Sequence, residues 1–127
     1  MHKADIETRE DILRLVRDFY TKVREDELLA PYFASISDWE HHMEKLTTFW
    51  ESSIFMKTKY FGNPLDAHVK VDQEHDQSIT QLHFGQWMNL WIETVDELYE
   101  GEYASRAKNR ARKMHTFLYM KIFEARQ

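Results

Sequence analysis

The chain is divided by the stretch Tyr60-Phe61-Gly62-Asn63-Pro64-Leu65-Asp66-Ala67-His68, which lies between two long, aromatic-rich helical segments. Gly62 and Pro64 end the preceding helix and reset the backbone direction. The spacing Leu65-x-x-His68 then places an apolar side chain and an imidazole on one face of a helical turn. Because a neutral imidazole is a good metal ligand, His68 is a candidate for holding a buried metal cofactor.

Length and composition favour a small helical protein. The chain has 127 residues, of which 43% are hydrophobic, and it contains eight Phe, six Tyr and four Trp. This length predicts a single domain, 1–127, with a core large enough to enclose a ligand. Only three Gly and two Pro are present, which leaves little material for the tight turns of hairpin sheets. The expected fold class is all-α.

Cysteine usage and charge exclude several classes of function. With no cysteine there is no disulfide framework and no thiolate site, which suits a reducing cytoplasm. No secretory signal is visible, and no apolar run reaches the roughly 20 residues of a membrane span. A net charge of −5 argues against nucleic-acid binding. One basic stripe, Arg106, Arg110 and Lys113, is interpreted as a solvated helix face, with an anionic partner as the alternative.

Four helical segments are predicted around short connectors. The first opens near Thr8, with Asp11 completing a capping box, and a short helical turn is expected within residues 26–33. The inward positions of the first helix are Ile12, Val16, Phe19, Tyr20 and Val23. The second follows a capping box at Ser37 and Glu40 and turns inward Trp39, His42, Met43, Leu46, Phe49, Trp50 and Ser53. His41 lies about 100° from His42 around this helix and is expected in solvent.

The third and fourth helices complete the predicted core. A cap at Ser78 and Gln81 starts the third helix, and Gly101 ends it. Its expected inward positions are Leu82, His83, Trp87, Leu90, Trp91, Thr94 and Leu98. The last helix presents first small and then larger side chains, namely Ala104, Ala107, Ala111, Met114, Leu118 and Ile122. The small residues predict a close approach to a neighbouring helix.

Three polar groups project from apolar stripes on three different helices: the Tyr20 hydroxyl, the His42 imidazole and the Trp87 indole N–H. Each taken alone is more simply a core residue whose polar atom reaches the surface or a local partner. Buried polar groups are costly unless they are paired. A core that gathers three of them is therefore expected to hold a ligand between them.

The motifs taken together resemble the group III truncated haemoglobins. The matching pattern comprises Phe19-Tyr20, Trp39-x-x-His42, Phe49-Trp50, Tyr60-x-Gly62-x-Pro64-Leu65-x-x-His68 and His83-Phe84-x-x-Trp87. The resemblance implies an all-α truncated globin, a two-over-two helical sandwich around haem b. It implies His68 as the proximal iron ligand and places Tyr20, His42 and Trp87 on the distal side. His75 is a second histidine near His68, but it lacks the Gly-x-Pro-Leu context.

By the same resemblance, three apolar side chains line the cofactor pocket. Leu46 and Phe49 match wall positions on the distal helix, and Phe33 matches an aromatic residue packed on the porphyrin. The implied ligands are O2, NO, CO or peroxide at a five-coordinate iron, and His42 could donate to them, act as a gate or coordinate the iron itself. No catalytic residue is assigned.

The expected role is gas binding, with NO dioxygenation or peroxidase-like chemistry as a further activity. The chain has no flavin or nicotinamide domain, so turnover would require an external reductase. A monomer or weak dimer is expected.

Two alternatives remain open from the residues: a cofactor-free helical interaction module, and a non-haem metal oxygen binder. The second would need repeated Glu-x-x-His motifs, whereas Asp72-x-x-His75 occurs singly.

Overall fold

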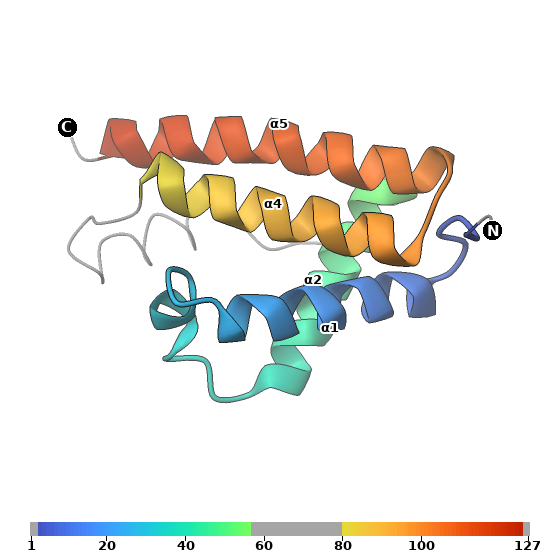
Figure 1. Cartoon of the computed structure of the whole chain (residues 1–127), viewed down its shortest axis with the longest axis horizontal. Coiled ribbons are helices and arrows are strands. Elements are labelled where there is room, and N and C mark those ends of the chain that lie inside the picture. The colour runs from blue at the N-terminus through green and yellow to red at the C-terminus, as the bar shows by residue number, and fades with distance from the viewer. Residues whose placement is uncertain (1–2, 57–79, 126–127) are drawn as a thin grey trace.

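The computed structural model describes residues 3–56 and 80–125 and shows a helical architecture (Figure 1). The elements are α1 (Arg9–Glu25), a short 3₁₀ helix η1 (Ala30–Phe33), α2 (Trp39–Ile54), α4 (Gln81–Leu98) and α5 (Glu102–Ala125). No strand occurs in these two ranges. The predicted all-α fold class is confirmed.

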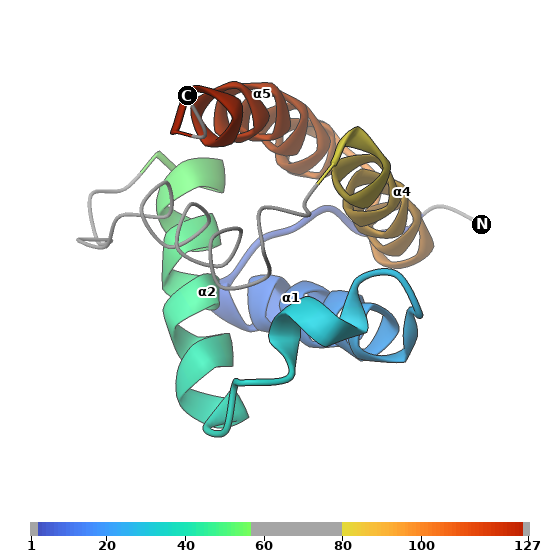
Figure 2. The same cartoon turned by 90° about the vertical axis from the view of Figure 1, so that its left-hand side faces the viewer.

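The helices form two layers, one made of α1 and α2 and the other of α4 and α5. α4 and α5 run antiparallel side by side, and α1 lies along α4 while α2 crosses α1 and reaches α5 (Figures 1 and 2). Each of these four helices thus contacts two others, and the apolar side chains meet in the space between the layers. His68 and the rest of the stretch 60–68 lie outside the described residues.

The first helix matches its sequence pattern. The Thr8 hydroxyl accepts from the Asp11 backbone N–H at 3.3 Å, and the Asp11 carboxylate accepts from the Thr8 N–H at 3.1 Å, which completes the predicted capping box. All five predicted inward residues are buried, and Leu15 joins them. The expected short turn is the 3₁₀ helix η1.

The predicted starts of α2 and α4 are each displaced. At α2 the N-cap is Asp38 rather than Ser37, and its carboxylate accepts from the His41 N–H at 3.1 Å. At α4 the N-cap is Thr80, and Ser78 lies outside the described residues. Adjacent Ser, Asp and Thr residues can all cap a helix, so composition alone does not choose between them.

Two side chains at the start of α4 were wrongly predicted to point inward. Leu82 is 69% exposed. The Nδ1 atom of half-buried His83 accepts from the Thr80 backbone N–H at 3.0 Å, so this imidazole completes the cap of α4. His83 stands at the third position of α4, where backbone N–H groups still need acceptors, and the buried face of the helix begins instead with Phe84 and Met88.

The start of α5 is capped by a distant residue. The Asp5 carboxylate accepts from the backbone N–H groups of Tyr103 and Ala104, both at 2.9 Å. Gly101 has a φ of 142° beside this carboxylate. Farther along α5, the fully buried Trp91 of α4 donates its indole N–H to the Ala107 carbonyl at 3.1 Å. This contact confirms the close approach predicted from the small residues of α5.

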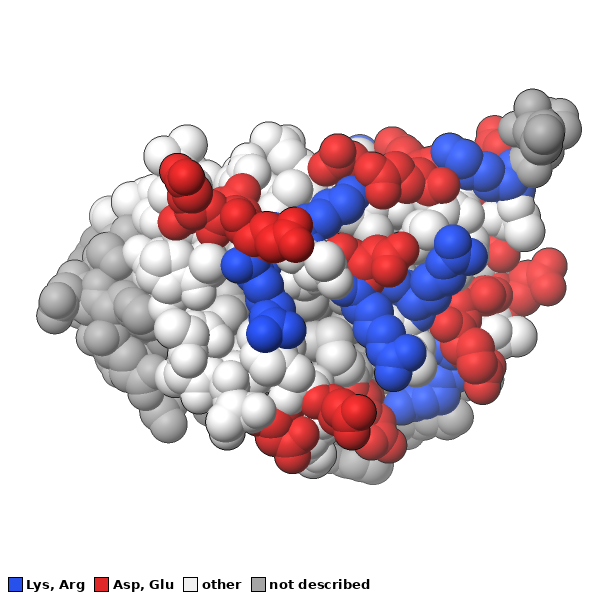
Figure 3. All heavy atoms as spheres, turned by 60° about the horizontal axis from the view of Figure 1, so that its bottom comes forward, with Lys and Arg blue, Asp and Glu red and all other residues white. Residues whose placement is uncertain are grey.

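The surface carries both signs of charge. Acidic and basic side chains are interspersed on the face shown in Figure 3. Lys22 on α1 pairs with Glu97 and Glu93 on α4 at 2.9 and 3.6 Å. Arg106, predicted in a solvated stripe, is half-buried and donates to the Ile54 carbonyl at 2.8 Å. That member of the stripe therefore covers the C-terminus of α2, while Arg110 and Lys113 are exposed.

Candidate functional site

The predicted polar residues from three helices lie together. The rings of Tyr20 on α1 and His42 on α2 meet edge to face, with 5.7 Å between centroids and 82° between planes. The Trp87 side chain on α4 acts on the Tyr20 hydroxyl as a hydrogen-bond donor does, because it lowers the pKa of this phenol. Because an indole N–H can only donate, the Tyr20 oxygen is the acceptor. Tyr20 is therefore the residue that links the other two.

The Tyr20 hydroxyl is held in its protonated form. Tyr20 is only 7% exposed, and burial raises the pKa of its phenol well above the usual range. The hydrogen bond from Trp87 lowers the pKa by a smaller amount. At neutral pH the group keeps its proton and can donate a hydrogen bond.

His42 presents a polar atom that lacks a hydrogen bond. Its Nε2 is buried and has no hydrogen-bond partner among the described residues. Burial lowers the pKa of this imidazole, and the electrostatic effects of Lys45 and His41 lower it further. The neutral form is thus favoured. An unsatisfied buried polar atom costs about 1–3 kcal/mol, so its presence here marks a place where a ligand is expected. His41 is exposed, as predicted.

Trp87 is fixed by an aromatic frame. Its ring meets Phe19 edge to face at 5.2 Å and is nearly parallel to Trp91 at 5.9 Å between centroids. Trp91 itself is anchored by its bond to α5. Trp87 remains half-buried, so part of its ring is available to a neighbouring group. Of the two indoles predicted inward on α4, Trp91 is structural and Trp87 borders the polar cluster.

The predicted pocket-wall residues are all half-buried. Phe33 of η1 meets the Tyr20 ring edge to face at 5.7 Å. Leu46 and Phe49 lie on α2 one and two turns beyond His42 and pack against the core, Phe49 against Trp50 at 5.2 Å. Their contact with a cofactor stays a prediction. His68 and His75 lie outside the described residues, so the structure describes only the side of the site formed by Tyr20, His42 and Trp87.

Trp39 belongs to this cluster and was not predicted as a site residue. Its ring lies 6.0 Å from that of Tyr20 and 5.4 Å from that of His42. The Arg24 guanidinium carbon lies 4.3 Å from the centre of the indole. The i, i+3 spacing of Trp39 and His42 on one helix was the signal that could have identified it.

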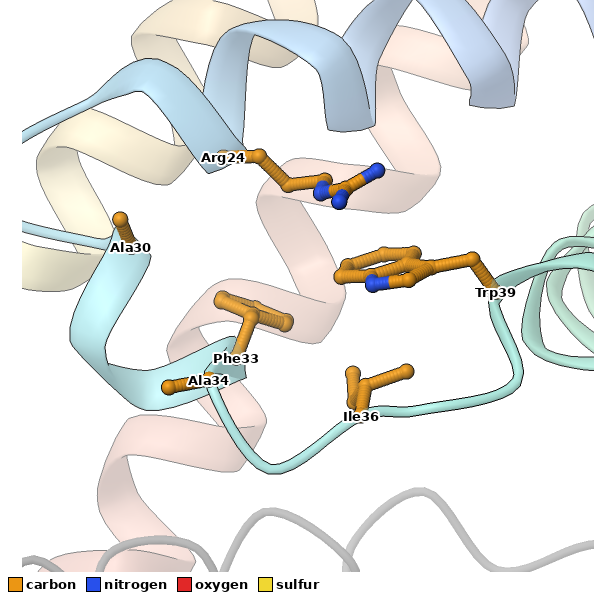
Figure 4. A pocket seen from close by; sticks show the side chains of 6 residues that line it. All are labelled: Arg24, Ala30, Phe33, Ala34, Ile36 and Trp39. Atoms are coloured by element: carbon orange, nitrogen blue, oxygen red, sulfur yellow. The ribbon is translucent and has the colours of Figure 1, made fainter.

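A surface pocket adjoins the cluster. It has a volume of about 230 Å³ and is lined by Arg24, Ala30, Phe33, Ala34, Ile36 and Trp39 (Figure 4). Phe33 and Trp39, which contact Tyr20 on their inner side, form part of this lining. The pocket therefore lies immediately outside the polar cluster.

Similarity to characterised proteins decides the family. No family model matches the chain. A group 3 truncated hemoglobin, ctb, from Campylobacter jejuni is 30% identical over 105 residues, which are 79% of this chain and 79% of the relative. The chain belongs to the group III truncated haemoglobins. The crystal structure of group III truncated hemoglobin from Campylobacter jejuni superposes with a TM-score of 0.82 at 27% identity and covers 94% of both chains.

Membership in the truncated haemoglobins confirms the predicted two-over-two globin fold and implies haem-based gas binding in general. The described residues fit the gas-binding side of a haem pocket, because they combine a buried imidazole nitrogen in need of a partner with a protonated phenol and apolar walls. Membership in this family favours neither of the two alternatives, a cofactor-free interaction module or a non-haem metal oxygen binder. Residues 3–56 and 80–125 hold no group of three or more His, Asp or Glu side chains arranged for a metal ion.

No described helix has the length and apolar character needed to cross a bilayer.

Proposed function

We propose that this truncated haemoglobin binds haem b through His68 and holds O2, NO or CO against Tyr20, His42 and Trp87. The observation that carries the proposal is the buried Nε2 of His42, which has no hydrogen-bond partner among the described residues and lies on a ring in contact with Tyr20. Phe33, Leu46 and Phe49 are the proposed apolar walls. The single domain 1–127, the cytoplasmic location and a monomer or weak dimer stay parts of this proposal.

Haem would supply an iron with one open coordination position for a diatomic gas. The chain would supply the direction of the hydrogen bonds. Because Trp87 donates to the Tyr20 oxygen, the Tyr20 O–H is left to point at another acceptor. A hydroxyl that accepts a hydrogen bond becomes a stronger donor in the next one. Trp87 would thus support Tyr20 as the principal donor in the pocket.

These donors would discriminate between gases. A strongly polarised ligand such as oxygen gains about 1.5–3 kcal/mol from a hydrogen bond of charge-assisted strength. Carbon monoxide is much less polarised and gains less. Neutral His42 carries one N–H and one free nitrogen, so it can donate to a ligand or accept from a water. A tightly held oxygen suits slow release or O–O activation better than bulk transport.

The test of the cofactor is direct. Protein purified from a haem-replete culture should be red, with an intense band near the blue edge of the visible spectrum, and hemin added to haem-poor protein should restore this band. Protein that stays colourless after hemin addition would overturn the proposal.

Redox chemistry is the second proposed activity, either NO dioxygenation or peroxide activation. The buried, protonated donor Tyr20 favours it, because such a donor polarises a bound oxygen species. Sustained turnover would use an external reductase. Protein equilibrated with oxygen should be mixed with nitric oxide and an electron donor. Fast, repeated nitrate formation would support detoxification, whereas a single stoichiometric reaction would favour gas binding alone.

A further inference from the structure

Trp39 separates the outer pocket from the polar cluster. On its inner side, its ring contacts both Tyr20 and His42, with centroid distances of 6.0 and 5.4 Å. It also lines the pocket of about 230 Å³ together with Phe33, which contacts Tyr20 as well. A water molecule occupies about 30 Å³ in the liquid, so this pocket has room for water or a diatomic gas. Among the described residues, these two aromatic rings stand between the pocket and Tyr20.

Arg24 covers the outer face of this indole. Its guanidinium carbon lies 4.3 Å from the ring centre, well within cation–π range, and Figure 4 shows the side chain extended along the ring. Within the described part of the chain, Arg24 makes no ion pair with a carboxylate. Among the described residues, the ring is therefore the principal partner of the guanidinium.

The position of Arg24 also has an electrostatic role that does not involve Trp39. Arg24 lies in the last turn of α1, where a cation interacts favourably with the helix dipole. Lys22 lies in the same turn and carries the same charge, but it pairs with α4 instead of covering Trp39. This lysine supplies a matched control.

We propose that Arg24 is a positioning residue that, by stacking on Trp39, holds the indole against Tyr20 and His42 and slows ligand entry from the outer pocket. The inference rests on the proposed function, since entry matters only if Tyr20 and His42 face a gas. Arg24 itself touches neither residue in any ring or hydrogen-bond contact of the described structure. Its effect must therefore pass through Trp39.

The test measures the association rate of carbon monoxide after flash photolysis of the haem-loaded protein. Arg24 is exposed, and a cation–π contact at an exposed site contributes about 0.5–1 kcal/mol. Arg24→Met keeps an apolar stem but removes the cation and should speed association by about twofold to fivefold. Arg24→Lys keeps the charge without the planar group and should give a smaller increase. Lys22→Met removes a charge from the same helical turn and should leave the rate unchanged. Equal rates for Arg24→Met and the wild type, or equal changes for Arg24→Met and Lys22→Met, would overturn the proposal.

A double-substitution cycle tests whether the effect passes through the indole. In a Trp39→Ala background the indole on which Arg24 stacks is already absent, so adding Arg24→Met should change the rate no further. A second full-sized acceleration in that background would show that Arg24 acts by another route. If Arg24→Met does not fold, Arg24→Lys with and without Trp39→Ala makes the same comparison.

A measurement that does not depend on haem or gas binding separates this inference from the proposed function. The four tryptophans each give one indole N–H signal by NMR, and Trp39→Phe identifies that of Trp39. On the protein as purified, Arg24→Met should speed hydrogen exchange of the Trp39 indole N–H by at least about threefold, with little change at Trp91. Failure to take up haem would refute the proposed function, whereas unchanged Trp39 exchange would refute the role of Arg24.

Discussion

The rings of Tyr20 on α1 and His42 on α2 meet edge to face inside the core, with 5.7 Å between their centroids. Tyr20 is nearly inaccessible to solvent, and the Trp87 indole N–H acts on its oxygen, which leaves the O–H proton for another acceptor. The phenol is thus fixed in place by one partner and remains able to donate to another.

Replacing Tyr20 by Phe should accelerate oxygen dissociation by roughly tenfold to a hundredfold, because it removes the proposed donor of a charge-assisted hydrogen bond. Stopped-flow displacement of oxygen by carbon monoxide measures the rate. Tyr99→Phe is the matched control, since the Tyr99 hydroxyl donates to the Asp11 carbonyl at 2.8 Å, away from Tyr20. It should cost about 1 kcal/mol of unfolding free energy and leave oxygen release unchanged. An unchanged rate in Tyr20→Phe would count against the donor role.

Replacing His68 by Ala should abolish stable haem binding or the five-coordinate ferrous spectrum, because this imidazole is the proposed iron ligand. His75→Ala removes a nearby histidine and should keep both. Hemin titration and the ferrous absorption spectrum measure the outcome. The opposite pattern, with loss in His75→Ala only, would assign the ligand to His75.

Stability should fall as the pH drops below about 6.5, the ordinary pKa of histidine. Burial lowers the pKa of His42, His83 and His115 in the folded protein, so between the unfolded and folded pKa values the unfolded chain binds more protons. The unfolding free energy therefore rises with pH in that window. Urea unfolding at pH 7.5 and 5.5 measures the difference.

His83 contributes to this pH dependence through the cap of α4. Its Nδ1 accepts from the Thr80 N–H, which a protonated imidazole cannot do, and a positive charge is unfavourable at a helix N-terminus. His83→Gln keeps an acceptor at the same capping position and should reduce the loss of stability at pH 5.5. A loss as large as that of the wild type would mean that other groups cause it.

Two glycine substitutions should have opposite effects. A Cβ added to Gly101 would lie 2.7 Å from the Asp5 Oδ2 atom, at a φ of 142° that side chains rarely adopt, so Gly101→Ala should destabilise the fold by about 2 kcal/mol or more. Gly85 lies inside α4, and among the described residues no atom beyond its chain neighbours and the adjoining backbone of the helix comes within 4 Å of the position that an added Cβ would take. Gly85→Ala should therefore stabilise the fold by about 0.5–1 kcal/mol. Thermal unfolding compares them, and destabilisation by both would contradict the geometry.

Periodicity predicted the long helices and their buried faces well, because one apolar stripe per helix is a local signal. Tyr20, His42 and Trp87 were selected as inward polar residues on the same grounds, and the structure brings them together. Their role toward haem stays a prediction. Predictions failed where adjacent residues compete for one task, as Ser37 and Asp38 do at the start of α2.

Contacts between distant segments were not visible in the sequence. Glu51, inside the apolar stretch of α2, is buried and pairs with Arg9 of α1 at 3.7 Å. Arg24 and Trp39 also come from different helices, and nothing in either local pattern indicates that one covers the other. Such pairs depend on how the layers are oriented, which the pattern of each helix taken singly does not specify.

The carboxylate of Asp5 also ties the beginning of the chain to its last helix, across 98 and 99 positions of sequence. Closing so long a loop is entropically expensive, so this contact should form late in folding. During synthesis, Asp5 is made long before Tyr103 and Ala104, so the cap of α5 cannot form until the helices between them have been made. Affinity tags at the N-terminus should accordingly be placed on a linker that leaves residues 3–6 undisturbed.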